Sequence, residues 1–350
     1  MQKKLIALAL ASAFAAPAFA ATSNVDVGGY MNMSFDVLDQ DIVGTDSKMN
    51  VSSNSSNIYF KGSEDLGGGM KAFWQIQTYF DAGATGNADF SFGGTGNGVA
   101  TGNTFVGLDT AWGKALMGKH EAPYKLVGRK YDFFNNTLGD SRNIIAFGGN
   151  DVRPNNVIAY GTPNFSGFTA LVAYVTNLGA GPNLGAQANA VSANAGYDNG
   201  PLSLGLGYQK LSLPFIGASD PSAWRFGASY KFGDFKVAAL YQQENNVGGV
   251  AANDSDAWGL GASYAMGAFT LKGQYYTLSR DLAANLDSDM WALGVDYSLS
   301  KRTSLYGVYA SMDNDIGAAR TPFGGGHGDN PGTVGGGNPD GFSLGVVHKF

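Results

Sequence analysis

Residues 25–37 read VDVGGYMNMSFDV and carry the pattern that decides the fold. Apolar side chains occupy one parity, beginning with Val25 and Val27 and ending with Phe35 and Val37, whereas Asp, Tyr, Asn and Ser occupy most of the other. Successive side chains of a β-strand point to opposite faces of the sheet. The segment therefore predicts a strand that has one apolar face and one wet face.

The same two-residue alternation returns in segments spread along the chain. Clear apolar sets are Phe168/Ala170/Val172/Tyr174, Trp224/Phe226/Ala228/Tyr230, Trp258/Leu260/Ala262/Tyr264 and Trp291/Leu293/Val295/Tyr297. These sets begin with Trp or Phe and end with Tyr, which is typical of strands whose two ends lie at the two membrane interfaces. A soluble β-sandwich also alternates, but it has no reason to place aromatic residues at both strand ends. The pattern predicts an all-β transmembrane barrel.

The first twenty residues have the features of a secretory signal peptide. Lys3 and Lys4 precede an apolar run over residues 5–16, and Ala18-Phe19-Ala20 fits a small-x-small cleavage site. The run is too short to cross a membrane as a helix. Removing residues 1–20, with their two lysines, changes the formal charge from −6 to −8. We expect one mature domain, residues 21–350, outside the cytoplasm.

The low content of charged residues, the many glycines and the acidic net charge limit the kinds of protein and partner that fit this sequence. Charged residues make up 14% of the chain, against about 25% in ordinary soluble domains, and glycine accounts for 52 of the 350 residues. An acidic chain lacks the basic face that nucleic acid requires, so we expect no nucleic-acid partner. The glycine-rich segments 81–101 and 324–337 lack the βαβ context of a nucleotide site. We interpret them as flexible external loops and expect no cofactor and no metal.

Short Gly- and Asn-containing turns alternate with long connections along the chain, and this alternation predicts the topology. Counting the segments between them gives 16 antiparallel strands, with short turns at one end of the barrel and long loops at the other, as in outer-membrane barrels. Pairing the first strand with the last would leave no unpaired edge in lipid. Residues 38–53 are expected to form the first long external loop.

Residues 121–151 form a connection far longer than a usual hairpin loop, beginning EAPYKLVGRKYDFFNNTLGDSRNIIAFGGN. We expect it to fold into the lumen and narrow the pore. Candidate charges at this level are Glu121, Asp132 and Asp140, the bases Lys125, Arg129, Lys130 and Arg142, and Arg153 on the adjoining wall. Parity also places Arg225, Lys272 and Asp296 on the lumen wall. Charges at a narrow level set ion selectivity; alternatively, several of them only tie the loop to the wall.

Four parts of the chain resemble the general, trimeric Gram-negative porins of the β-proteobacterial type. They are IYFKGSEDLG at 58–67, FVGL at 105–108 with MGKH at 117–120, NNVIAYGTPNFSGF at 155–168, and the terminal Phe350. The last resembles the C-terminal signal by which the barrel-assembly machinery recognises barrels for insertion.

This resemblance implies a homotrimer in the outer membrane, in contact with lipid and lipopolysaccharide, with the loop 81–101 reaching over a neighbouring subunit. It also implies a water-filled channel through which ions and small hydrophilic solutes diffuse passively. Members of the family carry wall arginines at positions that match Asn57 and Gly102, so that only Arg153 remains here. With a mature charge of −8 as well, we expect a modest preference for cations.

Two other functions are considered. A substrate-specific channel for sugars or organic anions would need a track of stacked rings, and the long connection offers Tyr124, Tyr131, Phe133 and Phe134. Packing of these rings onto the wall is the simpler interpretation. An outer-membrane enzyme would need a catalytic set, but His120 beside Glu121 has no visible nucleophile partner. We therefore predict that the protein is not an enzyme.

Overall fold

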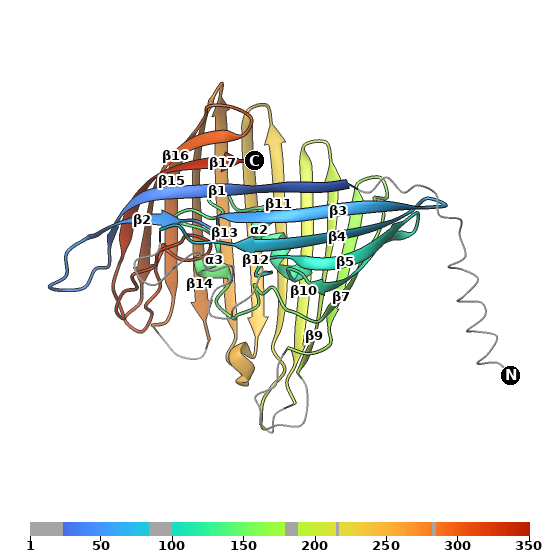
Figure 1. Ribbon diagram of the computed structural model, residues 1–350. Coiled ribbons are helices and arrows are strands. Elements are labelled where there is room, and N and C mark those ends of the chain that lie inside the picture. Colours follow the sequence, from blue (N-terminus) through green and yellow to red (C-terminus); the bar gives the residue numbers. More distant parts are fainter. Residues whose placement is uncertain (1–23, 84–99, 179–187, 215–216, 282–284) are drawn as a thin grey trace.

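The structure is a computed structural model that describes residues 24–83, 100–178, 188–214, 217–281 and 285–350. The predicted signal peptide lies outside these residues, and so does most of the loop 81–101 that is expected to reach a neighbouring subunit. The described chain forms long strands that curl into a barrel (Figure 1). None of its described helices is long and apolar enough to cross a membrane.

The described residues contain seventeen strand segments, all in one antiparallel sheet. Their bounds are β1 (Asn24–Asp39), β2 (Lys48–Ser53), β3 (Asn57–Gly67), β4 (Met70–Tyr79), β5 (Thr104–Thr110), β6 (Gly113–Lys119), β7 (Val157–Gly161), β8 (Phe168–Val175), β9 (Asn189–Asn199), β10 (Leu202–Ser212), β11 (Ser222–Phe232), β12 (Phe235–Asn245), β13 (Ser255–Met266), β14 (Phe269–Arg280), β15 (Ser288–Ser298), β16 (Thr303–Asn314) and β17 (Asp340–Lys349).

The sheet closes on itself as a 16-stranded barrel. β2 and β3 pair with successive halves of β1, so they are two parts of one interrupted barrel strand. β1 also pairs with β17, from Tyr30 opposite Lys349 to Asp39 opposite Asp340. No edge is therefore left open to lipid, which an apolar bilayer core requires. The predicted strand number, antiparallel order and closure are confirmed.

The first external connection is shorter than the sequence predicted. Residues 48–53 form a strand and not a loop, and they pair with the C-terminal half of β1. The physical reason is that their apolar side chains match those of β1: Met49 lies opposite Val37 and Val51 lies opposite Phe35. Both members of each pair lie on the same outward face, so pairing extends the apolar surface of the barrel.

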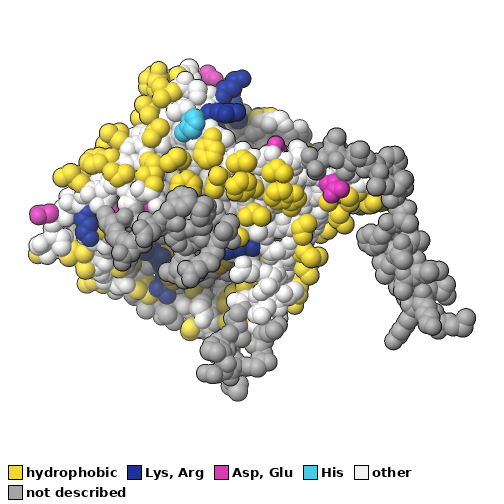
Figure 2. All heavy atoms as spheres, viewed as in Figure 1, with side chains coloured by type: hydrophobic (Ala, Val, Ile, Leu, Met, Phe, Trp, Pro, Cys, Tyr) yellow, Lys and Arg dark blue, Asp and Glu magenta, His cyan; other side chains and the backbone are white. Residues whose placement is uncertain are grey.

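The apolar parity of the strands faces outward. Val25 is 62% exposed, Phe35 and Trp224 are both 47% exposed, and Phe226 is 48% exposed. Figure 2 shows apolar side chains spread over the barrel face in view, with few charges among them. A contiguous apolar surface of this kind is unfavourable in water but matches the hydrocarbon of a bilayer.

Loop 3, defined here as residues 121–151, folds inside the barrel (Figure 1). It contains α2 (Pro123–Lys130), which packs on β8–β11, and α3 (Arg142–Ile145), which packs on β13–β15. Pro123 stands at the start of α2, where a missing N–H costs nothing. A further short 3₁₀ turn, η1 (Val247–Gly249), lies outside this loop.

Glycines on the lumen face of the wall explain where loop 3 can sit. A Cβ atom on Gly227 would lie 2.1 Å from the Cδ2 atom of Tyr131, and one on Gly261 would lie 2.5 Å from the Cδ2 atom of Phe133. The two rings therefore occupy space that any larger wall residue would fill. The sequence pattern identified these glycines only as part of the polar face. In the structure they leave the space on the wall into which rings of loop 3 pack.

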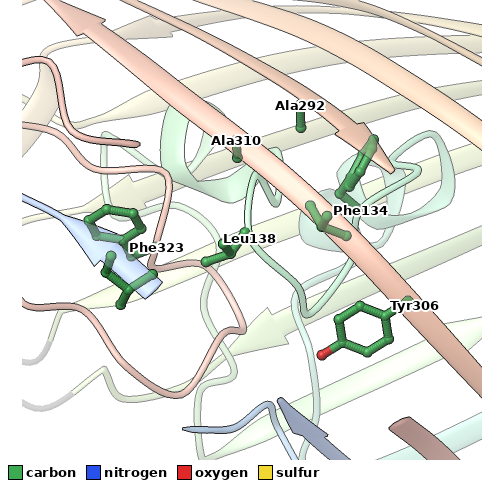
Figure 3. Close-up of a cluster of buried hydrophobic side chains, with 8 residues drawn as sticks. Phe134, Leu138, Ala292, Tyr306, Ala310 and Phe323 are labelled. Atoms are coloured by element: carbon green, nitrogen blue, oxygen red, sulfur yellow. The ribbon is translucent and has the colours of Figure 1, made fainter. Parts of the chain in front are cut away.

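The tip of loop 3 is anchored by an apolar cluster inside the barrel (Figure 3). Phe134 and Leu138 of the loop are 0% exposed, and so are Leu38 of β1 and Phe323 of the β16–β17 connection. Close packing of this kind holds a loop in one position, because each displaced side chain would leave a cavity.

Candidate functional site

A cavity of about 190 Å³ lies between loop 3 and the opposite wall. Loop 3 contributes Lys125, Arg129, Asn136 and Arg142, and the wall side contributes Ser55, Tyr79 and Arg153. We call it the cationic cavity, because its lining contains four cationic side chains and no carboxylate. Loop 3 packs on β8–β11 and β13–β15. The cavity lies on the other side of the loop, which faces Tyr79 at the end of β4.

Glu121 is buried behind this cavity and binds three of its cations. Its Oε1 atom lies 2.7 Å from Nη1 of Arg129, 2.9 Å from Nη2 of Arg153 and 3.4 Å from Nζ of Lys125. Burial by itself would raise the pKa of Glu121, but the three neighbouring cations outweigh it and lower the pKa to about 2. The carboxylate therefore stays ionised and spaces the cations around it.

Arg153 is fixed to the wall as well as to Glu121. Its Nε donates to Oδ1 of Asn103 at 3.1 Å, and its Nη2 donates to the hydroxyl of Tyr79 at 2.9 Å. The guanidinium also lies 4.9 Å from the centre of the Tyr79 ring. Among the described residues, Nη1 of Arg153 has no hydrogen-bond acceptor, so one edge of the guanidinium is left for a solute.

Asp140 is fully buried beneath Arg142 and does not reach the cavity. Its Oδ2 atom lies 2.6 Å from Nη2 of Arg142 and accepts a hydrogen bond from the backbone N–H of Asn136 at 2.7 Å. Burial would raise the pKa of Asp140, but the guanidinium of Arg142 reverses the direction and lowers it. This carboxylate thus neutralises and orients Arg142 from behind.

Asp132 points toward the β14 wall. It accepts hydrogen bonds from Nε2 of Gln274 at 2.9 Å and from the backbone N–H groups of Phe134 and Ser141 at 2.9 and 3.3 Å. Burial and the nearby Asp140 carboxylate raise the pKa of Asp132 to about 7. Asp132 therefore helps to dock the loop and lies away from the cationic cavity.

Two of the three wall residues predicted from parity, Arg225 and Lys272, contact loop 3. Arg225 is 0% exposed and forms an ion pair with Asp151 at 2.8 Å. Lys272 pairs with Asp296 at 3.0 Å, and its ammonium lies 4.8 Å from the centre of the Phe134 ring. Arg225 and Lys272 contact the loop, Asp296 pairs with Lys272 on the wall, and none of the three lines the cavity.

The predicted site residues thus divide into two groups. The structure brings Lys125, Arg129, Arg142 and Arg153 around the cavity, with Glu121 behind them. It does not bring the others to the cavity lining: Lys130, which pairs with Asp198 at 2.8 Å, and Asp132, Asp140, Arg225, Lys272 and Asp296. Salt bridges between the loop and the wall, one of the two alternatives for these charges, account for two residues of the second group, Lys130 and Arg225.

The β16–β17 connection is a part of the site that sequence reasoning missed. Residues 322–328 pack inside the barrel, where the N–H of Gly139 donates to the carbonyl of Pro322 at 2.8 Å. Nε2 of His327 lies 3.0 Å from Oδ2 of Asp36 on β1, and the N–H of Gly328 donates to Oδ1 of Asn54 at 2.8 Å. The interpretation as a flexible external loop is wrong for these residues.

The glycine triplet 324–326 is required by close approach to loop 3. A Cβ atom on Gly326 would lie 2.2 Å from Nη2 of Arg142, and one on Gly325 would lie 2.8 Å from Cβ of Asp140. The available sequence signal was the position of this triplet between Phe323 and His327, since a solvated loop has no need of a large apolar side chain there.

Comparison with known proteins agrees with this architecture. The family model described as Gram-negative porin matches residues 7–317. The chain belongs to the Gram-negative porin family. Outer membrane porin protein 32 of Delftia acidovorans is 32% identical to this porin over 335 residues, a match that spans 90% of each chain.

Solved structures match the porin over nearly its whole length. An anion-selective porin from Comamonas acidovorans matches with a TM-score of 0.77 and 27% identity, covering 94% of this chain and 100% of the other. The trimer form of OmpT from Vibrio cholerae matches with a TM-score of 0.67, covering 94% and 99% of the two chains, but its 17% identity shows the fold alone. The porin is therefore an outer-membrane protein of a Gram-negative bacterium, and its relatives are channel proteins.

Proposed function

We propose that this porin is a general diffusion channel, whose mature domain, residues 21–350, follows a signal peptide, residues 1–20. Ions and small hydrophilic solutes would diffuse through it passively. Its narrowest level would be the cationic cavity, with loop 3, residues 121–151, as the constricting element. The observation that carries this proposal is that residues of loop 3 and of the opposite wall line one polar cavity inside a closed barrel.

We further propose that the channel prefers anions. The expectation of a modest cation preference used the charge of the mature chain and the absence of arginines at Asn57 and Gly102, whereas selectivity depends on all charges at the narrowest level. There, the lining holds Lys125, Arg129, Arg142 and Arg153, while the carboxylates of Glu121 and Asp140 are buried behind them. The anion-selective relative from Comamonas acidovorans is in line with this sign.

Two further arginines support the same sign. The guanidinium groups of Arg280 and Arg320 lie 4.4 and 4.2 Å from the centre of the Phe147 ring in loop 3. Burial and the neighbouring Arg280 lower the pKa of Arg320 to about 10, which still leaves it charged at neutral pH. An anion that enters from the loop end of the barrel would meet this pair before the cationic cavity.

The alternative of a substrate-specific sugar or organic-anion channel loses its expected basis. Of the four loop-3 rings considered for a stacking track, Tyr124 and Phe134 are 0% exposed and Tyr131 is 2% exposed. These three pack against the wall, and the half-buried Phe133 ring packs over Gly261, so the four rings do not form a continuous stacking track for a sugar.

We propose a homotrimer in contact with lipid and lipopolysaccharide, as the OmpT relative is described in a trimer form. We also propose that Phe350 forms the insertion signal read by the barrel-assembly machinery. Its backbone N–H and carbonyl both pair with Gly29 at 3.1 Å, and its side chain stays 42% exposed. Cross-linking in native membranes tests the trimer, and outer-membrane yield of a Phe350→Ala variant tests the signal.

The deciding experiment is recording from the purified protein in a planar bilayer under a tenfold KCl gradient. We expect stepwise water-filled conductances and a zero-current potential with the sign of anion preference. Absence of any conductance would contradict the channel, and the opposite sign of potential would contradict the proposed selectivity. We expect no hydrolase activity in the same preparation, since we propose that the protein is not an enzyme.

A further inference from the structure

A second cavity, of about 210 Å³, opens on the lumen side of β1 and β3–β5. Its lining includes Asp26, Lys61, Phe73, Gln75 and Phe105, and we call it the aromatic hollow. Along β4, Gln75 and Phe73 stand four and six positions before Tyr79 of the cationic cavity, which is about 13–20 Å measured along the strand. A solute that has passed the cavity would therefore meet the hollow next.

Two phenylalanine rings form the floor of the hollow. Phe73 and Phe105 lie edge to face, with ring centres 5.9 Å apart and an angle of 72° between the ring planes. Both are half-buried, and Phe73 lies over Gly107, where a Cβ atom would come within 2.6 Å of its Cζ atom. The rings thus lie against the wall and leave apolar surface toward the lumen.

Partly exposed apolar rings at this place need a reason, because the water-facing surface of a porin lumen is mostly polar. Phe73 and Phe105 have the same parity on their strands as lumen-facing Gln75 and Tyr79, and Gln75 lies directly opposite Phe105. Among the described residues, the His120 ring lies 5.5 Å from Phe105 and the Lys114 ammonium lies 5.9 Å from the centre of Phe73, and both phenylalanine rings stay partly exposed. Exposed apolar surface beside polar groups is typical of a ligand-binding groove.

Two opposite charges stand beside these rings without being bonded to each other. Asp26 and Lys61 are directly opposite in the β1–β3 register, and both side chains are exposed. Neither has an ion pair within 4 Å among the described residues. The ammonium of Lys61 instead lies 5.2 Å from the centre of the Tyr59 ring. A ligand that carries both charges could therefore bind one to each residue.

We propose that the aromatic hollow is a weak binding site for aromatic amino acids in transit through the channel. The ligand ring would pack on Phe73 and Phe105, in the edge-to-face or offset arrangement that aromatic pairs prefer. Its carboxylate would face Lys61 and its ammonium would face Asp26. This inference rests on the proposed channel function, because it names a solute class that the pore would retain.

The charge arrangement separates this ligand class from close alternatives. An aromatic carboxylate such as phenylacetate has the ring and the partner for Lys61, but it presents nothing to neutralise Asp26. Glycine has both charges but no ring. We therefore expect L-phenylalanine to bind more tightly than either compound, even though the cationic cavity admits all three.

The test is single-channel recording of the purified porin in KCl with L-phenylalanine, glycine or phenylacetate added at millimolar concentrations. We expect concentration-dependent interruptions of the current with phenylalanine and at least fivefold weaker effects with the other two. Phe105→Leu, which keeps an apolar side chain, and Lys61→Gln should each weaken the phenylalanine effect at least fivefold. Asp26→Asn should reverse the order, so that phenylacetate becomes the better ligand.

Matched substitutions away from the hollow serve as controls. Phe232→Leu removes an exposed ring on the outer face, and Lys210→Gln removes an exposed lysine that pairs with Asp220 at 3.3 Å. Neither should change the phenylalanine effect. A wild-type channel that conducts KCl but shows no response to phenylalanine would overturn this inference and leave the channel intact. Equal effects of phenylalanine and phenylacetate would overturn the role of Asp26, and absence of conductance would contradict the proposed function itself.

Discussion

Glu121 and Arg153 form an ion pair of 2.9 Å that joins the start of loop 3 to the wall segment directly after its end. The same Oε1 atom binds Arg129 at 2.7 Å, so one buried carboxylate holds cations from both sides of the cationic cavity. The negative charge therefore lies behind the cavity lining and the positive charges face it.

Replacing Glu121 with Gln should increase anion preference, because it removes a negative charge directly behind the lining. The pKa of about 2 means that this carboxylate is still ionised at pH 4, below the usual value of about 4.3 for glutamate. The difference in zero-current potential between variant and wild type should thus persist at pH 4 and vanish only as the pH falls toward 2. Zero-current potentials at pH 7 and pH 4 test this; loss of the difference at pH 4 would contradict it.

The same pKa fixes the sign of the linkage to stability. Because the pKa of Glu121 is lower in the folded state, its ionised form stabilises the fold above the unfolded-state value of about 4.3. That contribution is lost as the pH falls through about 2. The stability gap between wild type and Glu121→Gln should accordingly narrow only at the acid end of a pH series.

Replacing Arg153 with Gln should shift selectivity toward cations. A unit charge about 4 Å from a passing ion interacts by about 1 kcal/mol in water-like surroundings, which corresponds to roughly a fivefold change in local anion occupancy. Zero-current potentials in a KCl gradient measure the shift, with Lys210→Gln as a control for loss of a lysine outside the cavity. An unchanged potential would mean that ions pass away from Arg153.

Replacing Arg225 with Gln should detach loop 3 from the wall. Arg225 is fully buried, and its loss leaves Asp151 buried without its cation, which typically costs about 3–5 kcal/mol. Denaturant unfolding in detergent micelles measures this change. Lys210→Gln, which breaks an exposed pair, should change the unfolding free energy by less than about 1 kcal/mol.

Replacing Gly227 with Ala should displace the Tyr131 ring, because the new methyl group would lie 2.1 Å from Cδ2 of the ring. Overpacking of this kind costs about 1–3 kcal/mol, and the displaced loop should change the single-channel conductance. Gly161→Ala is the matched control, since its Cβ atom would meet its nearest neighbour at 3.6 Å. Equal conductance in both variants would show that the space beside Gly227 does not position loop 3.

Replacing Phe323 with Ala should loosen the β16–β17 connection inside the barrel. Removing a fully buried phenylalanine costs about 3–5 kcal/mol, and the freed segment should widen the entrance and raise conductance. Ion selectivity should stay unchanged, because the cavity cations are not replaced. Phe165→Ala, at a ring that is 61% exposed, provides the control. A selectivity change in Phe323→Ala alone would mean that this segment also positions Arg142.

Local pattern was enough to predict the barrel. The alternation that starts at Val25 recurs in strand after strand, and a strand must be apolar wherever it faces lipid, so its period can be read without any distant contact. Residues 48–53 were wrongly predicted as loop, because a segment of six residues is too short to show a clear alternation. Only their pairing with β1 identifies them as a strand. Loop 3 was likewise recognised from its length and its mixture of charges.

By itself, then, the sequence determined the membrane barrel, its closure and the presence of an inward loop, since these depend on which side chains lipid tolerates. Only the tertiary structure decided which charges line the cavity. Glu121, Asp140 and Arg142 all lie in one segment. Their order along the chain does not indicate that the two acids are buried whereas Arg142 lines the cavity. The orientation of these side chains depends on their burial, on contacts with strands far away in sequence, and on the space beside wall glycines.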